Sequence, residues 1–228
     1  MSIVYQTRPS DSPFVESITH GYTTSDGAPT RPAETNWHMV FVKTQGQVHN
    51  FVVGPWTEAG VVNYWAGAEI LWIRFKLGVF IPHLPAQHLL NRETALPAAT
   101  GNAFWLKGTT WQLPDFENAD TFLQRLAHDE LLICDPIVDA ALQGHLSDTP
   151  SRTVRHRFLR ATGLSQKHIQ QVERAQQAAA LLQQGVSILD TVYELGYFDQ
   201  PHLTRSLKRF IGTTPAQLIP AHCQKVDS

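Results

Sequence analysis

The side chains between Gln200 and Arg209 have the chemistry that reads nucleic acid. Polar and cationic groups alternate there with three apolar residues at helical spacing, Leu203, Leu207 and Phe210. Guanidinium and amide groups form bidentate hydrogen bonds with base edges in the major groove, and cations contact phosphates. We therefore predict a helix with a DNA-contacting face that consists of Gln200, His202, Thr204, Arg205, Lys208 and Arg209.

A second apolar-periodic segment precedes this one and supplies a partner helix. Ile188, Val192 and Leu195 recur at helical spacing, so this helix also buries one face. Between the two helices, Gly196 suits the left-handed end of the first, and Asp199 suits the N-cap of the second. The segment therefore predicts a helix-turn-helix, a motif whose second helix enters the major groove.

Individual side chains on this face have more than one interpretation. Arg205 is expected to contact guanine, or else a phosphate or solvent. Gln200 is expected to read adenine, or else to cap the helix near Asp199. Lys208 and Arg209 lie further along the helix, so we expect them to contact phosphates rather than bases.

A basic helix is predicted upstream, after a turn rich in capping residues and before Gly163. Val154 and Phe158 form its apolar face, and four of its basic side chains are predicted to contact DNA, Arg152, Arg155, His156 and Arg160. A long helix rich in Ala, Leu and Gln follows and ends at Gly185. Together with a short leading helix after Asp135, these segments predict two helix-turn-helix units joined by one long helix.

The charge distribution agrees with this division. Residues 151–228 contain ten Lys or Arg and five Asp or Glu, so this part has a net charge of +5. Residues 1–150 contain eight Lys or Arg and fifteen Asp or Glu, so this part has a net charge of −7, and the two parts sum to the overall −2. A basic C-terminal part is suited to phosphates, and the acidic part requires a different role.

The N-terminal part has the pattern of a small antiparallel sheet or partly open barrel. Strands are predicted over residues 37–43 and 47–53, joined around Gln45 and Gly46, and over residues 70–76. Shorter strands are predicted at 61–65 and 103–106, whereas residues 1–35 are rich in Pro, Ser and Thr and predict irregular or weakly extended structure. A helix is predicted over 118–132. The fold class is therefore α+β, with a β-rich domain over 1–115, a helical connector over 116–134 and a helical DNA-binding domain over 135–228.

The C-terminal text resembles a known family. ATGLS at 161–165, and then LLQQGVSILDTVYELGYFDQPHLTRSLKRFIGTTPAQL, resemble the DNA-binding domain of the arabinose-regulator (AraC/XylS) family. The resemblance implies recognition helices at about 151–161 and 200–211 that enter two successive major grooves of double-stranded DNA. A shorter similarity, RFKLGVFIPHLPA at 74–86, implies a cupin-like sensor domain. Its expected partners are a small-molecule effector and a second copy of the chain.

The sequence also allows functions other than DNA binding. His38, His49, His83 and His88 could be imagined as metal ligands of a cupin-type enzyme with a helical appendage, but their spacing does not favour a site. No catalytic motif or cofactor fingerprint is recognised, so we expect neither an enzyme nor a cofactor. Pro201 is also compatible with another function, that of a protein-interaction module that does not bind DNA. Without an evident signal peptide or membrane span, the expected location is cytoplasmic.

Overall fold

A computed structural model describes residues 3–145 and 149–220 of the chain. The chain divides into two compact units, and each is described by itself. The first consists of Met1–Ala28, Thr35–Pro55 and Asn63–Ser165, and the second of Pro29–Glu34, Trp56–Val62 and Gln166–Ser228. Within the described ranges, every helix is too short or too polar to cross a membrane.

The main sheet of the first unit has six strands in the order β1-β2-β7-β4-β5-β9. All neighbouring strands are antiparallel. Their bounds are Ile3–Arg8 (β1), Val15–Thr23 (β2), Glu69–Phe75 (β7), His38–Thr44 (β4), Gln47–Val53 (β5) and Glu93–Ala95 (β9). The predicted hairpin around Gln45 and Gly46 joins β4 to β5, so this part of the prediction is confirmed.

Shorter elements complete the first unit. Val79–Phe80 (β8) pairs with Ile133–Cys134 (β13), and Ala98–Ala99 (β10), Ala103–Leu106 (β11) and Thr109–Gln112 (β12) form a separate three-stranded sheet. The helices are Ala86–Leu89 (α1), Ala119–His128 (α2), Pro136–Leu142 (α3) and Ser151–Thr162 (α4).

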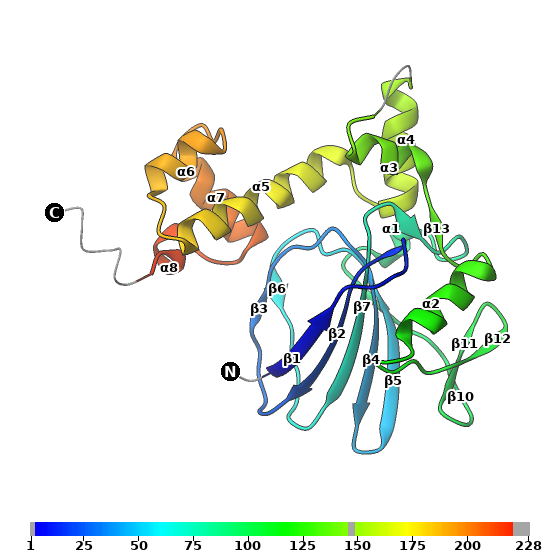
Figure 1. The fold of residues 1–228 in the computed structure, drawn as a ribbon. Helices are drawn as coiled ribbons and strands as arrows, with labels where there is room; N and C mark the ends of the chain where they lie inside the picture. Colours follow the sequence, from blue (N-terminus) through cyan, green and yellow to red (C-terminus); the bar gives the residue numbers. More distant parts are fainter. Residues whose placement is uncertain (1–2, 146–148, 221–228) are drawn as a thin grey trace. The chain divides into compact units, whose positions relative to one another are not determined.

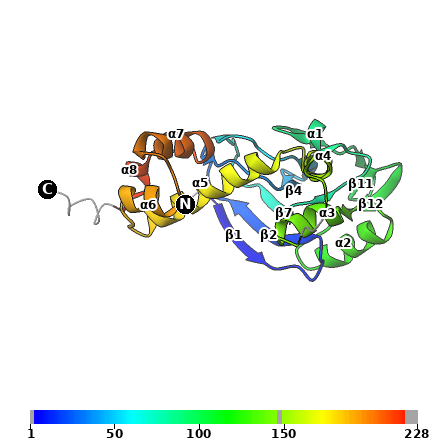
Figure 2. The same cartoon turned by 90° about the horizontal axis from the view of Figure 1, so that it is seen from above.

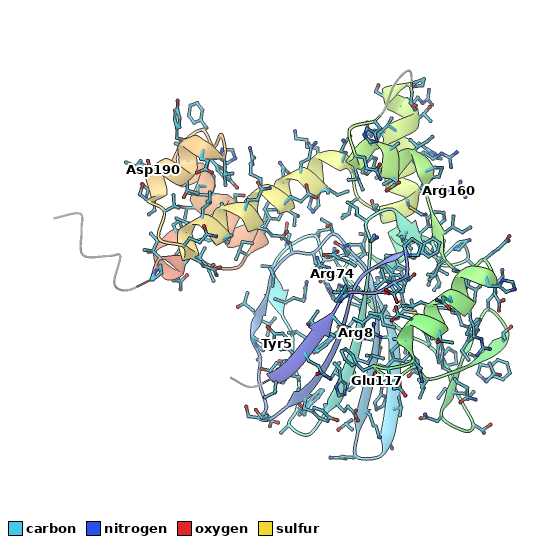
Figure 3. All side chains as sticks on the ribbon, viewed as in Figure 1. Tyr5, Arg8, Arg74, Glu117, Arg160 and Asp190 are labelled. Carbon is cyan, nitrogen blue, oxygen red and sulfur yellow. The ribbon has the colours of Figure 1, made fainter. Side chains whose placement is uncertain are left out.

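The core of this unit lies between the main sheet, β11, β12 and α2, which lie side by side in Figure 1. Phe104 on β11 is fully buried, and its ring lies 5.7 Å from that of Phe41 and 6.2 Å from that of Phe122. Arg8, at the end of β1, forms an ion pair with Asp120 in the first turn of α2 (Figure 3). Helix α2 is therefore fixed both by apolar packing and by a charged contact.

Several predicted elements of the N-terminal part differ from the structure. Residues 1–35, predicted to be irregular or weakly extended, contain two regular strands, β1 and β2. On the face of β2 that carries the buried Ile18, the next positions are the half-buried His20 and the exposed Tyr22, so the strand lacks a continuous apolar alternation. The strand predicted at 61–65 is only Gly60–Val61 (β6). The helix predicted over 118–132 ends at His128, since Glu130 takes a positive φ of 55°.

The second unit is mainly helical. Its helices are Gln166–Gln183 (α5), Ile188–Glu194 (α6), Gln200–Phe210 (α7) and Pro215–Leu218 (α8). Both ribbon views show α6, α7 and α8 gathered around the C-terminal half of α5 (Figures 1 and 2). Thr30–Arg31 (β3) pairs with β6 in the same unit.

The fold class is α+β, as predicted, with a β-rich sheet domain followed by a helical region. The compact units differ from the domains predicted along the sequence, because α3 and α4 group with the sheet. Asp135, for example, caps α3 while its backbone N–H donates to the carbonyl of Gly78. The predicted domain boundaries at 115 and 134 therefore stay a prediction.

Replacing Phe104 with Ala should destabilise the first unit by about 3–5 kcal/mol, because it removes a buried ring and leaves a cavity among aromatic neighbours. Urea unfolding followed by circular dichroism measures this loss. Trp65→Ala is the control, since that side chain is 72% exposed and its removal should change stability by no more than about 0.5 kcal/mol. Equal effects of the two changes would contradict the described core.

Candidate nucleic-acid interface

Helix α7 is positioned by its apolar face. Leu203 and Leu207 are fully buried, and they pack with Ala178 and Leu182 of α5 in one hydrophobic cluster. Phe210, one turn further along, is also buried. Burying a Leu side chain contributes about 1.5–3 kcal/mol, so rotating α7 about its axis would be strongly unfavourable. The opposite face of α7 is therefore held toward solvent.

The turn before α7 is built as predicted. Gly196 has a φ of +65°, a left-handed conformation that a residue with a side chain adopts at a cost. Asp199 Oδ1 accepts a hydrogen bond from the backbone N–H of His202 at 2.6 Å, which makes Asp199 the N-cap. Pro201 lies in the first turn, where a missing N–H leaves no helical hydrogen bond unmade. Pro201 is thus compatible with an intact α7.

The predicted residues of α7 differ in exposure. Gln200, Arg205, Lys208 and Arg209 are exposed, whereas His202 and Thr204 are half-buried. The His202 ring packs edge-on against Tyr197, with 5.2 Å between ring centroids, and its Nδ1 accepts from the backbone N–H of Phe198. His202 therefore also has a structural role in holding the turn against the helix.

The three cations of α7 also differ in their contacts. Arg209 Nε donates to Glu58 Oε1 at 2.9 Å, so this guanidinium is already paired. In the part of the chain that the structure describes, Arg205 and Lys208 have no ion-pair partner. Their charges are therefore available to an anionic ligand.

A surface hollow of about 310 Å³ is lined by side chains from both α7 and α5. Its lining includes Arg205 and Arg209 from α7 together with Gln171 and Arg174 from α5. The Arg174 guanidinium lies over the Tyr197 ring, 4.5 Å from its centroid. Sequence analysis did not single out Arg174. The signal was its position three residues after Gln171, which places both side chains on one face of α5.

Helix α4 carries the other predicted residues, within the first unit. Val154 and Phe158 are buried, as predicted, and Arg152, Arg155 and His156 are exposed. Arg160 is exposed as well (Figure 3), with its guanidinium over the Phe80 ring at 5.7 Å. The turn that leads into α4 is only partly described, because Ser147 and Asp148 of the predicted capping turn lie outside the described residues.

A fifth basic side chain of α4, Arg157, turns toward α3 rather than outward. Its Nη1 lies 3.3 Å from Oδ2 of Asp135, which is 2% exposed. The other carboxylate oxygen of Asp135 accepts from the backbone N–H groups of Ile137 and Val138 at the start of α3. This buried carboxylate therefore links α3 to α4.

Residues 147–219, which span α4 to α8, match a family model described as a helix-turn-helix domain, and this domain is of the AraC type. Residues 147–219 therefore form an AraC-type helix-turn-helix domain. A domain of this type supports a DNA-binding transcription regulator. No curated protein and no solved structure matches the chain.

The N-terminal part contains the histidines considered above as metal ligands, together with several tryptophans. Among the described residues, no three His, Cys, Asp or Glu side chains form a group that could hold a metal ion. The tryptophans of this part have separate environments: Trp37 is buried and stacks on Phe75, whereas Trp65 and Trp105 are exposed.

Replacing Asp199 with Ala should destabilise α7 by about 0.5–2 kcal/mol, because the N–H of His202 loses its acceptor. Asp199→Asn is the matched control, since it keeps a side-chain oxygen at the same place and should retain most of the stability. Urea unfolding of both variants at one pH measures the difference. Equal losses would show that the negative charge of Asp199 matters and not its hydrogen bond.

Proposed function

We propose that this regulator binds specific DNA sequences by inserting α4 and α7 into two successive major grooves. The observation that carries the proposal is the exposed basic face of α7, which lies within the matched helix-turn-helix region. Exposed cations attract phosphates, and side chains near the start of a recognition helix reach base edges.

Each predicted residue has a distinct role in this proposal. Arg205 is exposed and unpaired among the described residues, so it is the side chain proposed to read guanine. Lys208, further along the helix, contacts a phosphate. On α4, the exposed Arg152, Arg155 and His156 form the corresponding face. Gln200 remains the candidate for adenine.

The long helix α5 supports the use of two grooves. It has 18 residues, and at 1.5 Å per residue its length is about 27 Å. Successive major grooves on one side of B-DNA lie roughly 34 Å apart. A connecting helix of this length therefore suits two recognition helices that serve neighbouring grooves.

We also propose that an effector binds in the sheet domain. A cavity of about 180 Å³ opens at one end of the core-facing side of the main sheet, over β2, β4, β5 and β7. Its lining combines ionisable groups with apolar walls, and includes His20, Phe41, Lys43, Val48, Glu69 and Phe116.

Glu69 is the centre of the polar part of this cavity. Its Oε1 lies 2.9 Å from His20 Nε2 and accepts a hydrogen bond from the Tyr22 hydroxyl at 3.0 Å. The hydrogen bond with His20 lowers the pKa of Glu69, against an opposing effect of burial, so the carboxylate is charged at neutral pH. The cavity therefore fits a small molecule with a polar group for Glu69 or Lys43 and an apolar part for Phe41 and Phe116.

Selection of genomic DNA fragments on the purified full-length protein tests the proposed function. The fragments retained after several rounds should share one sequence, and affinity for that sequence should fall steeply as salt rises. Enrichment of no sequence would contradict sequence-specific binding.

Arg205→Ala should weaken binding to the selected sequence by about 1–3 kcal/mol and weaken binding to random DNA much less, because a base contact is lost. Titrations with both DNAs measure the two losses. Lys208→Ala is the comparison variant, since the loss of a phosphate contact should weaken both DNAs equally and reduce the salt slope by about one. Equal losses for Arg205→Ala would assign Arg205 to a phosphate.

Val48→Trp should fill the proposed effector cavity, and Glu69→Gln should remove its central charge. Compounds that raise the melting temperature of the wild-type protein in a small-molecule screen should therefore not raise the melting temperature of either variant. Val4→Trp makes the same change on an exposed strand, so it should leave these responses intact. Compounds that still stabilise both cavity variants would place the effector site elsewhere.

A further inference from the structure

Two segments from the N-terminal half of the sequence belong to the second, helical unit. Residues Pro29–Glu34 and Trp56–Val62 run antiparallel, with β3 paired to β6 and backbone hydrogen bonds exchanged between Glu34 and Trp56 at 2.9 and 2.8 Å. The Arg31 guanidinium stacks on the Trp56 ring, 3.8 Å from its centroid. We call this two-stranded element the ribbon.

The ribbon caps the C-terminal end of α7. The last carbonyls of a helix lack partners within the helix and need donors from elsewhere. Ala33 N–H donates to the carbonyl of Phe210 at 2.6 Å, and Ala59 N–H donates to that of Arg209 at 2.8 Å. Gly212 follows at a φ of +85°, and a Cβ there would lie 2.3 Å from the Thr30 side chain. The ribbon and the end of α7 are thus in contact at the level of the backbone.

Apolar packing joins the ribbon to α5 as well. Ala33 is fully buried in a cluster with Phe210 of α7 and with Val172 and Ala175 of α5. Gln176 Nε2 of α5 donates to the carbonyl of Ala33 at 3.2 Å. The ribbon is therefore a built part of the helix-turn-helix unit rather than a loop that merely passes it.

The ribbon also holds a DNA-facing charge. Glu58 accepts the hydrogen bond from Arg209 Nε, and about half of each side chain is exposed, 56% and 51%. An ion pair this accessible to water is weak, so Arg209 can leave it for another anion. Nearby, burial and the charge of Arg209 lower the pKa of His168, so the imidazole is neutral at pH 7 and does not offset Glu58.

We propose that Glu58 competes with DNA for Arg209, and that the ribbon thereby restrains the DNA affinity of α7. This inference rests on the proposed role of α7 in DNA binding. A carboxylate and a phosphate bind the same guanidinium in the same way, so only one of them can occupy Arg209 fully. An unpaired Glu58 beside bound DNA also repels the phosphates. DNA binding therefore requires Arg209 to give up its ion pair with Glu58 of the ribbon.

Chain connectivity links this restraint to the sheet domain. The ribbon segments lie within the connections from β2 to β4 and from β5 to β7. Those four strands also line the cavity around Glu69. A ligand that shifts these strands can thus alter the ribbon through the chain itself, and through it the availability of Arg209.

The test compares four full-length proteins on the selected DNA: wild type, Glu58→Gln, Arg209→Gln and the double variant. Glu58→Gln should tighten binding roughly three- to tenfold at low salt and steepen the salt slope by about one, because Arg209 becomes free to contact a phosphate. In the Arg209→Gln background, the same change should have little effect. Glu194→Gln, which removes an equal charge from exposed α6, is the control for net charge.

Three outcomes would overturn the inference. Glu58→Gln could weaken binding, it could act no more strongly than Glu194→Gln, or its gain could persist without Arg209. Equal melting temperatures of the variants confirm that each is folded. Failure of the wild-type protein to bind DNA would instead overturn the proposed function, and the inference with it, so the two failures are distinguishable.

Discussion

The burial of one face of α7 against α5 is the constraint on which the rest of the helical unit depends. Leu203 and Leu207 are fully buried, and together with Phe210 they fix the rotation of α7 about its axis. That rotation decides which side chains meet solvent. Arg205 and Lys208 are exposed because of where the apolar stripe lies, and not through contacts of their own. The surface that we propose to face DNA is therefore a consequence of the core.

The elements that follow from local patterns could be predicted from the sequence. The stripe of Leu203, Leu207 and Phe210, the turn at Gly196 and the cap at Asp199 all depend on residues close together in the chain. The same holds for the hairpin around Gly46. In each case residue type and spacing specify one conformation, so a single sequence suffices.

Other features required the folded chain. The partner of Arg209 is Glu58, 151 residues earlier, and no local pattern links the two. Strand β2 was not predicted as a regular strand because the face that carries Ile18 continues with the half-buried His20 and the exposed Tyr22, which hydrogen-bond with Glu69 rather than pack in an apolar core. The ion pair of Arg157 was not predicted, since its partner Asp135 is brought close only by the packing of α4 on α3.

The two halves of the regulator share a physical theme, which is a carboxylate that holds cationic or hydrogen-bonding partners at a site where a ligand is proposed to bind. Glu69 does so in the sheet domain, and Glu58 does so at the end of α7. Strands that line the first site continue along the chain into the ribbon that carries the second. We propose that an effector acts on the DNA-binding surface by this route, without any direct contact with DNA.

Methylation protection on the selected DNA tests the central claim most directly, because it reports guanine N7 in the major groove. The account predicts two protected segments, with centres about ten base pairs apart on one side of the duplex, for each bound chain. It further predicts that Arg205→Ala exposes guanine in one segment and leaves the other protected. Protection of a single segment, or none in the major groove, would contradict recognition by both α4 and α7.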